Sequence, residues 1–181
     1  MSFSSKIILF LRFSLIANAG IAQVGLVEPK LEFAFEAVIT LDLAQDLGIT
    51  TYGKRRIIPI TGGTFEGPQM RGTILAGGAD WQTVRADGTA DLEARYTLKT
   101  DDGTLIYIQN KGIRTGKPEV LARLAKGEKV DPSEYYMRTF ATFEVAEGKY
   151  AWLTKCVVAA TGLRNANSVV IRFFNDFLMI F

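Results

Sequence analysis

The sequence predicts an all-β protein: a single closed or nearly closed antiparallel β-barrel of about eight to ten strands with one short helix. Three observations predict this fold class. Apolar and polar residues alternate over many short segments, turn residues separate those segments, and one segment alone has a helical pattern. Closure into a barrel removes the exposed edges that an open sheet would leave. A two-sheet β-sandwich is the alternative.

Chain length and cysteine content are consistent with one domain that needs no covalent cross-links. A chain of roughly 150 ordered residues buries about 68–70% of its unfolded surface, and this sequence has 181 residues. Cys156 is the single cysteine, so no internal disulfide can form. It lies in the apolar run C-V-V-A-A, which predicts a buried core thiol.

Residues 1–22 have the pattern of a signal peptide or leader. Lys6 precedes an apolar stretch, and Ala17-Asn18-Ala19 fits the small-x-small rule for cleavage. Arg12 interrupts the apolar stretch, so an uncleaved leader is the alternative. Cleavage would make the protein periplasmic or secreted; otherwise it would be cytoplasmic. The stretch is too short and too interrupted for a stable membrane span.

The charge balance argues against a nucleic-acid partner. The chain has 21 basic and 19 acidic residues, and the leader contributes Lys6 and Arg12 but no acid. The remaining 19 basic and 19 acidic residues give a neutral body, which lacks the basic footprint of a nucleic-acid binder. We expect a small-molecule ligand as the partner, and the composition leaves a homo-oligomer open.

The absence of histidine from the sequence limits the chemistry further. Without it, histidine-based zinc sites and Ser-His-Asp or Cys-His catalysis are excluded. A single cysteine also excludes a CxxC redox or zinc motif. The remaining acids do not form a convincing metal-binding pattern. We therefore predict no metal and no cofactor.

The first half of the domain is predicted to be built from strands. We expect them at residues 31–42, 49–60, 64–75 and 79–84, with a connection or short helical turn at 43–47. Pro59 lacks a backbone donor, which places the end of the second strand at an edge or a bulge. Gly67-Pro68 breaks the third strand.

The second half adds more strands and the one helix. Strands are expected at residues 91–99, 104–114, 135–146, 155–162 and 168–177, followed by an apolar C-terminal tail at 178–181. Asp101-Asp102-Gly103 is a strong hairpin signal between the first two of them. The helix is expected at residues 118–126, because Pro118 lies near its start and Gly127 just past its end.

The segment from Ile60 to Gln82 is rich in glycine but is no flexible linker, because apolar residues interrupt the glycines. Glycines within strands mark bulges and tight bends, so Gly62-Gly63 is assigned to barrel geometry. No helix follows it, which makes it a poor phosphate-binding loop. Asp80-Trp81 places a polar group beside an apolar wall, the arrangement expected of a pocket.

Several motifs lie in a recognisable order along the chain. They are G-K-R-R-I-I-P-I-T-G-G at residues 53–63, F-E-G-P at 65–68, G-G-A-D-W-Q at 77–82, D-G at 102–103, Y-I-Q-N-K-G at 107–112 and Y-Y-M-R-T at 135–139. In this the sequence resembles the bacterial and fungal domain-of-unknown-function 3237 family, also called uncharacterised protein family 0311. The resemblance spans residues 29–177. It implies one β-barrel domain of lipocalin-like appearance and no settled reaction.

Asp80, Tyr136 and Arg138 are the candidate catalytic residues. Asp80 could act as a general base, because an apolar wall would raise the pKa of its carboxyl group. The alternative is that it caps the backbone of the adjacent turn. Arg138 could grip a carboxylate or enolate oxygen while Tyr136 donates a second hydrogen bond. Both roles require the strand face that Tyr136 and Arg138 share to point into the barrel.

A structural role for Arg138 is the alternative, as a strand-pinning ion pair with Asp80, Glu66 or Asp102. Six further residues are the candidate ligand-binding set. They are Arg56, Glu66, Trp81, Arg95, Asn110 and Tyr135. For Arg95 and Asn110, on neighbouring strands, an exterior or structural role is the alternative.

Two functions of different class fit these features. The first is a cofactor-free acid/base enzyme of lyase, isomerase or cyclase type that acts on a small polar or aromatic acid. The second is a lipocalin-like binding or carrier protein that holds a small molecule without changing it. The grouping of aspartate, arginine and tyrosine favours the enzyme, whereas analogy between folds favours the carrier.

Overall fold

The computed structural model describes residues 27–176. The predicted leader and C-terminal tail lie outside this range. The elements in chain order are β1 (Leu31–Leu41), β2 (Gln45–Thr50), β3 (Gly53–Glu66), β4 (Arg71–Ile74), β5 (Gly78–Val84), β6 (Ala90–Thr100), β7 (Leu105–Gly116), α1 (Pro118–Ala125), the 3-10 turn η1 (Pro132–Glu134), β8 (Tyr135–Val145), the 3-10 turn η2 (Ala151–Thr154), β9 (Val158–Arg164) and β10 (Ser168–Asp176).

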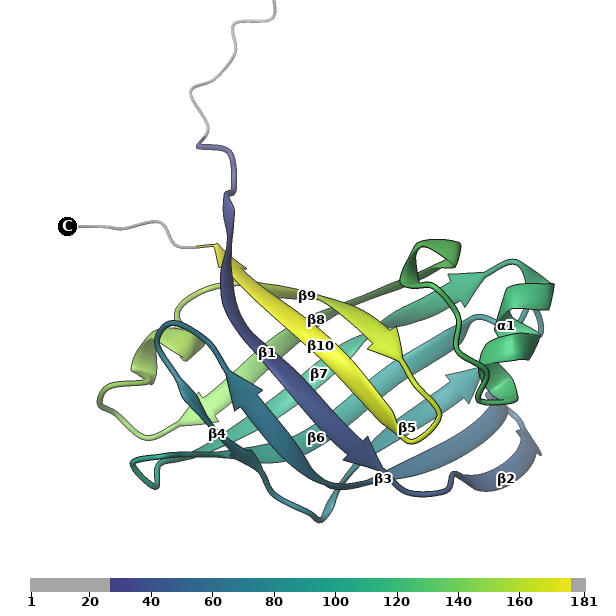
Figure 1. The fold of residues 1–181 in the computed structure, drawn as a ribbon, viewed down its shortest axis with the longest axis horizontal. Helices are drawn as coiled ribbons and strands as arrows, with labels where there is room; N and C mark the ends of the chain where they lie inside the picture. The colour runs from purple at the N-terminus through teal and green to yellow at the C-terminus, as the bar shows by residue number, and fades with distance from the viewer. Residues whose placement is uncertain (1–26, 177–181) are drawn as a thin grey trace, which may run out of the picture.

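The antiparallel strands close into a barrel, which confirms the predicted fold class over the β-sandwich (Figure 1). The sheet runs β1-β10-β9-β8-β7-β6, and β1 also pairs with β3 on its other side. Both β4 and β5 pair with β3 and with β6, so these two short strands share one position around the barrel. β2 is an extra strand that pairs with the first part of β3.

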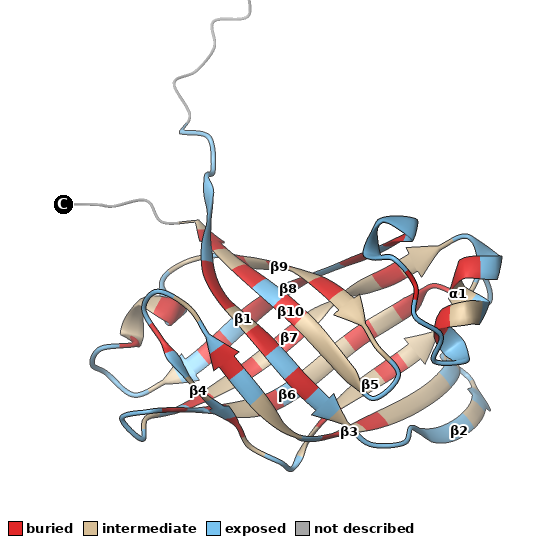
Figure 2. Cartoon of the chain, viewed as in Figure 1, coloured by how far each residue is buried: buried red, intermediate tan, exposed pale blue. Residues whose placement is uncertain are grey.

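Alternation along the strands separates the barrel interior from its surface. In β8 the residues are alternately buried and exposed, with Met137 and Thr139 inside and Tyr136 and Arg138 outside. Figure 2 shows the same change of burial from residue to residue along the other strands. Because successive side chains of a strand point to opposite faces, this pattern decides which polar residues can reach a site inside the barrel.

Aromatic side chains fill one end of the interior. Phe35 stacks on Phe173 with ring centroids 4.4 Å apart and meets Phe65 and Phe143 edge to face. Phe35 and Phe173 are fully buried. Such contacts stabilise a core beyond their buried area, so this end of the barrel is a packed aromatic core.

The other end of the barrel is covered by α1 and by the turns near it (Figure 1). α1 follows β7 directly and buries Val120 and Leu124 in the core cluster. The predicted helix is confirmed, including proline in its first turn. Among the described residues, no helix is long and apolar enough to cross a membrane.

Three predicted segments differ from the structure. The segment at 43–47 is no helical turn, because β2 begins at Gln45 and continues to Thr50. Residues 51–52 form a tight turn that returns the chain into β3, so the predicted strand at 49–60 is divided between two strands. The predicted strand at 155–162 begins later, at Val158, because residues 151–154 form a 3-10 turn.

Gly62 and Gly63 allow β3 to bend as it passes along β1. Their φ angles are +146° and +144°, which L side chains rarely adopt. A Cβ atom at Gly63 would lie 2.2 Å from the carbonyl oxygen of Val38 on β1. The pairing register between β1 and β3 shifts at the neighbouring position, between Thr40 and Leu41. The glycine pair therefore forms a bulge, as expected for barrel closure.

Candidate active site

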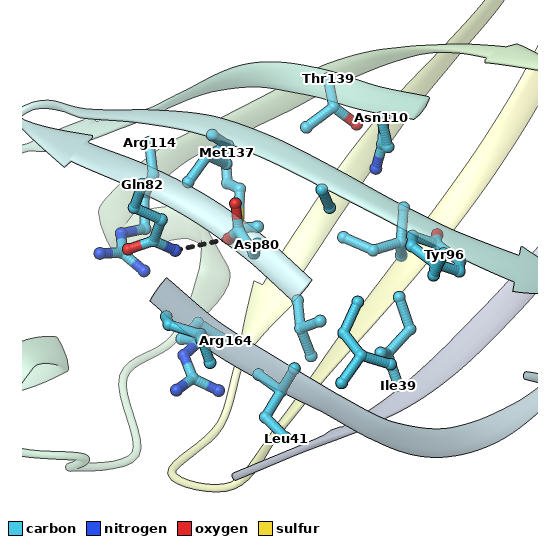
Figure 3. Close-up of a pocket in the computed structure, with 16 residues that line it drawn as sticks. Ile39, Leu41, Asp80, Gln82, Tyr96, Asn110, Arg114, Met137, Thr139 and Arg164 are labelled. Carbon is cyan, nitrogen blue, oxygen red and sulfur yellow. Dashed lines mark hydrogen bonds between the residues drawn. The ribbon is translucent and has the colours of Figure 1, made fainter. Parts of the chain in front are cut away.

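A cavity of about 40 Å³ lies inside the barrel, on the side of the aromatic cluster nearer to α1. Apolar side chains of β1, β3, β6 and β10 form much of its wall. Polar side chains enter from five strands: Asp80, Gln82, Tyr96, Asn110, Arg114, Thr139 and Arg164 (Figure 3). A cavity needs roughly 10–15 Å³ to hold one water molecule, so this one has room for more than a single water.

Asp80 is placed in this cavity by the alternation of β5. It lies opposite Ala94 of β6 and Ile58 of β3, and both of these side chains also line the cavity. Its Oδ2 accepts a hydrogen bond of 2.6 Å from Gln82 Nε2, and its Oδ1 accepts one of 3.0 Å from the backbone N–H of Glu93. These two donors fix the orientation of the carboxyl group.

The environment of Asp80 raises the pKa of its carboxyl group above the ordinary value. Burial is the largest cause, and the hydrogen bonds from Gln82 and Glu93 oppose it. The side chain keeps intermediate accessibility because it borders the cavity, although protein surrounds the carboxyl group. A raised pKa makes the ionised carboxylate a stronger proton acceptor than a carboxylate exposed to water.

Two arginines lie at the same end of the cavity as Gln82 (Figure 3). Arg114 is only 8% exposed, and burial lowers the pKa of its guanidinium group. Arg164 donates hydrogen bonds to the carbonyl oxygens of Ser168 and Ala166, at 2.9 and 3.2 Å. Burial, with the positive charges of Arg114 and Arg56, lowers the pKa of Arg164 to about 10. Both groups therefore remain cationic at neutral pH.

Arg56 and Tyr135 adjoin these arginines. Arg56 on β3 lies directly opposite Gln82 on β5. Because directly opposed residues point to the same face of a sheet, Arg56 shares the inner face. The Tyr135 hydroxyl accepts a hydrogen bond of 2.9 Å from the backbone N–H of Arg164, which ties the end of β9 to β8.

Several buried polar atoms of the cavity wall have no hydrogen-bond partner within residues 27–176. They are Gln82 Oε1, Tyr96 Oη, Asn110 Oδ1, Arg114 Nε and Thr139 Oγ1. Every one of them belongs to a residue that lines the cavity. A buried polar atom without a partner costs free energy, and such atoms in a native protein require an explanation. Their convergence on one space is the expected feature of a ligand-binding site.

Of the predicted site residues, the structure brings Asp80 and Asn110 together in the cavity and places Arg56 and Tyr135 beside it. Tyr136 and Arg138 do not join them, because β8 turns that face outward. Arg138 instead donates to Met137 O and to Thr161 Oγ1 and lies 5.1 Å from the centroid of the Tyr136 ring. The predicted grouping of Arg138 with Asp80 is therefore not formed.

The remaining predicted residues also lie on the outer surface. Trp81 and Arg95 line a shallow recess on the outside of β5 and β6, and Arg95 forms an ion pair with Glu93. Glu66 is exposed at the end of β3, near the turn that precedes β4. These residues have no access to the cavity from those positions.

Gln82, Arg114 and Arg164 were not predicted, although alternation contains a signal for two of them. Gln82 follows Asp80 by two residues, and Arg114 continues the face of Ile108 and Asn110 along β7. Arg164 lies beyond the predicted end of its strand, so its face could not be assigned. In the structure β9 extends to this residue.

Other catalytic groups are not assembled in the described part of the chain. No group of three or more His, Cys, Asp or Glu side chains there could hold a metal ion. Cys156 is half-buried, and burial raises the pKa of its thiol. A raised pKa lowers the thiolate fraction, so this thiol has no sign of activation as a nucleophile.

Comparison with known proteins assigns this barrel to a family. Residues 29–175 match the family described as Protein of unknown function (DUF3237). The chain belongs to the DUF3237 family. A UPF0311 protein of Bradyrhizobium diazoefficiens is 43% identical over 145 residues, which cover 79% of this chain and 95% of that protein. The family resemblance inferred from the sequence motifs is confirmed.

Solved structures extend the likeness of this DUF3237 protein to its fold. The crystal structure of a beta-barrel like protein from Acinetobacter baumannii has a TM-score of 0.75 and 43% sequence identity. The match covers 84% of this chain and 99% of that one. The crystal structure of an enzyme from Penicillium herquei has a TM-score of 0.63 at 23% identity, over 83% of this chain and 96% of that one, which shows a shared fold.

One relative of this DUF3237 protein has a name that states an activity. It is a hydroalkoxylation enzyme from Penicillium herquei, 35% identical over 80 residues. The match covers 44% of this chain and 53% of that enzyme.

Proposed function

We propose that this protein is a cofactor-free acid/base enzyme that moves a proton on a small organic molecule held inside the barrel. The observation that carries the proposal is the environment of Asp80. Its carboxyl group is oriented by Gln82 and by the Glu93 N–H, and it faces a cavity whose wall presents polar atoms without partners in the described structure. A carrier would be served by an apolar lining with few charges.

Four polar residues of the cavity then have distinct roles. Asp80 transfers the proton, and Gln82 holds the carboxyl group in position. Arg114 and Arg164 stabilise negative charge that develops on the reacting molecule. Fixed cationic groups in a site shielded from water stabilise such charge strongly, because they need no reorganisation during the reaction.

The name of the Penicillium herquei relative supports a reaction class, the addition of a hydroxyl group across a carbon–carbon double bond. Ionised Asp80 would accept the hydroxyl proton while the oxygen bonds to one carbon of a double bond conjugated to a carbonyl group. The π electrons move to the carbonyl oxygen, where the arginines stabilise the enolate. Asp80 then returns the proton to the other carbon, which restores the carboxylate. The reverse sequence is an elimination.

The test is incubation of the purified protein with a metabolite extract. Mass spectrometry would follow both the metabolites in solution and the mass of the native protein. The proposal predicts that many equivalents of one metabolite disappear and that an isomer of equal mass, or a pair of elimination products, takes its place. Capture of one equivalent of an unchanged molecule would identify a carrier and contradict the proposal.

A further inference from the structure

The end of the cavity formed by Arg56, Arg114 and Arg164, here called the arginine end, has more positive than negative charge. Asp80 borders it, and Asp46 of β2, which is ion-paired with Lys54, lies opposite Arg56. On the surface, other arginines are ion-paired with a carboxylate, namely Arg71, Arg85, Arg95, Arg123 and Arg172. No such ion pair is formed by the three arginines at the cavity with any residue between 27 and 176.

The contacts of the arginine end leave donors free to bind a ligand. Arg114 is buried, and its Nε lacks a partner within the described chain. Arg164 uses two of its nitrogen atoms on the carbonyl oxygens of Ser168 and Ala166, which brace its guanidinium group. A guanidinium group has five donors in a planar fork that matches a planar oxygen anion.

The three arginines also repel one another, which indicates that their positive charge is not fully compensated. The positive charge of Arg56 lowers the pKa of both Arg114 and Arg164, and Arg114 further lowers the pKa of Arg164. Asp80 opposes these shifts only in part. An anion bound among the three arginines would remove this repulsion.

The opposite end of the cavity has a different chemistry. Asn110 Oδ1 is an acceptor without a partner in the described structure, and Thr139 Oγ1 beside it is also unpartnered. Figure 3 shows these two side chains on the far side of Asp80 from Arg114 and Arg164. Ile58, Ile60 and Leu92 add apolar wall to the same cavity. A molecule that spans the cavity therefore meets cations at one end, hydrogen-bonding groups at the other and apolar surface along its sides.

We infer that the site takes organic anions: molecules in which a planar, conjugated oxygen anion binds Arg114 and Arg164 and the far end donates a hydrogen bond to Asn110. Carboxylates and enolates share this chemistry. The inference deepens the proposed function and rests on it for the statement that such anions are substrates. It places the anion-binding group inside the barrel, whereas the sequence had suggested Arg138.

The test uses formate and acetate as small planar anions, and formamide and acetamide as neutral molecules of nearly the same shape. Their binding is followed by NMR through the Nε–H signals of the arginines in the ¹⁵N-labelled full chain. We expect saturable binding of the anions, with a downfield shift of the Arg114 Nε–H signal, and no saturable binding of the amides.

The variants are Arg114→Gln and Arg164→Gln, with Arg172→Gln as the matched control. Arg172 also lies on a strand, but it points outward and is ion-paired with Glu36. Removing one partner of a buried charged pair weakens binding by roughly 30-fold or more, so each cavity variant should lose at least that factor for acetate, and the control should not change. Arg114→Lys keeps the charge and should retain part of the affinity.

Three results would overturn the inference: no saturable binding of either anion, equal binding of the amides, or wild-type affinity in both cavity variants. The NMR shift in the wild-type chain decides the question even if a variant fails to fold. Anion binding by the Asp80→Asn variant distinguishes a failure of this inference from a failure of the proposed function. Anion binding that persists in this variant, combined with a failure of the wild type to turn over any metabolite, would refute the enzyme but leave the anion site.

Discussion

At one end of the barrel, the rings of Phe35, Phe65, Phe143 and Phe173 pack against one another. At the other end, the same strands direct Asp80, Arg114 and Asn110 into a cavity, where several polar atoms find no partner in the described protein. The aromatic end lowers the free energy of the fold by burial and packing. The polar end raises it, because desolvated charges and unpaired polar atoms are unfavourable.

This difference indicates that one end of the barrel stabilises the fold and the other end provides the functional site. A protein that tolerates unfavourable groups at one end needs a stable core elsewhere, and functional sites are the usual places for such groups. Substitutions should therefore have opposite effects on stability at the two ends. Removing side-chain volume should destabilise the aromatic end, whereas removing polarity should stabilise the cavity end while impairing the activity.

The largest effect is expected for Phe35→Ala at the aromatic end. The substitution removes a fully buried ring that contacts three other rings, and such changes cost about 3–5 kcal/mol. Urea unfolding would measure the free energy of unfolding. Phe140→Ala is the control, because Phe140 is 55% exposed on the outside of β8. A loss for Phe35→Ala no larger than for the control would contradict the packed end.

The next effect concerns two aspartates, whose ionisation should change the free energy of unfolding with pH in opposite directions. Folding raises the pKa of the Asp80 carboxyl group above its ordinary value of 3.8. As the pH rises from 3.8 through the raised pKa, Asp80 ionises in the folded protein, and the free energy of unfolding falls. Asp80→Asn should therefore be more stable than the wild type at neutral pH, because asparagine carries no charge to desolvate. The advantage should vanish below about pH 4.

Asp102 near the aromatic end supplies the contrast. Hydrogen bonds from Thr100, Thr104 and Tyr150 lower the pKa of its carboxyl group. The wild type should therefore be more stable than Asp102→Asn at neutral pH, and this advantage should shrink as pH falls below the ordinary pKa. Thermal unfolding of the three proteins across pH 3–8 measures both trends. If the stability difference from the wild type changed with pH in the same way for both variants, the environments assigned to Asp80 and Asp102 would be contradicted.

The smallest effect is expected for Thr139→Val in the cavity. Valine has nearly the shape of threonine but removes Oγ1, which is buried without a partner in the described chain. We expect a gain of about 1 kcal/mol in the free energy of unfolding. Thr142→Val, an exposed position on the outer face of the same strand, should change stability by less. A destabilised Thr139→Val protein would mean that the hydroxyl has a stabilising partner.

Local sequence signals were sufficient for much of the fold. Alternation defined β6 and β7, Asp102-Gly103 defined their hairpin, and Pro118 and Gly127 marked the ends of the helix. β2 was missed because Leu43, Leu47 and Ile49 are exposed at the rim, so its pattern does not reflect a buried face. Its pairing with β3 is a local hairpin through the turn at residues 51–52, and Thr51-Tyr52 is not a typical hairpin turn sequence.

The site was harder to predict because it depends on which face of each strand points inward. On β8 the outward face has Tyr136, Arg138 and Phe140, which resemble a binding surface, whereas the inward face has the plainer Met137 and Thr139. Asp80 was predicted because it lies beside Trp81, which places a polar group next to an apolar wall. The arginine end joins three distant strands, and closure of the barrel alone brings them together.

The most direct test of this account compares Asp80→Asn and Arg138→Gln with the wild type in the metabolite-extract assay. Asp80 lies in the cavity and Arg138 on the outer face. We predict that the wild type and Arg138→Gln convert the same metabolite at similar rates, while Asp80→Asn loses at least about 100-fold in rate. Wild-type turnover by Asp80→Asn, or loss of turnover in Arg138→Gln alone, would contradict the account.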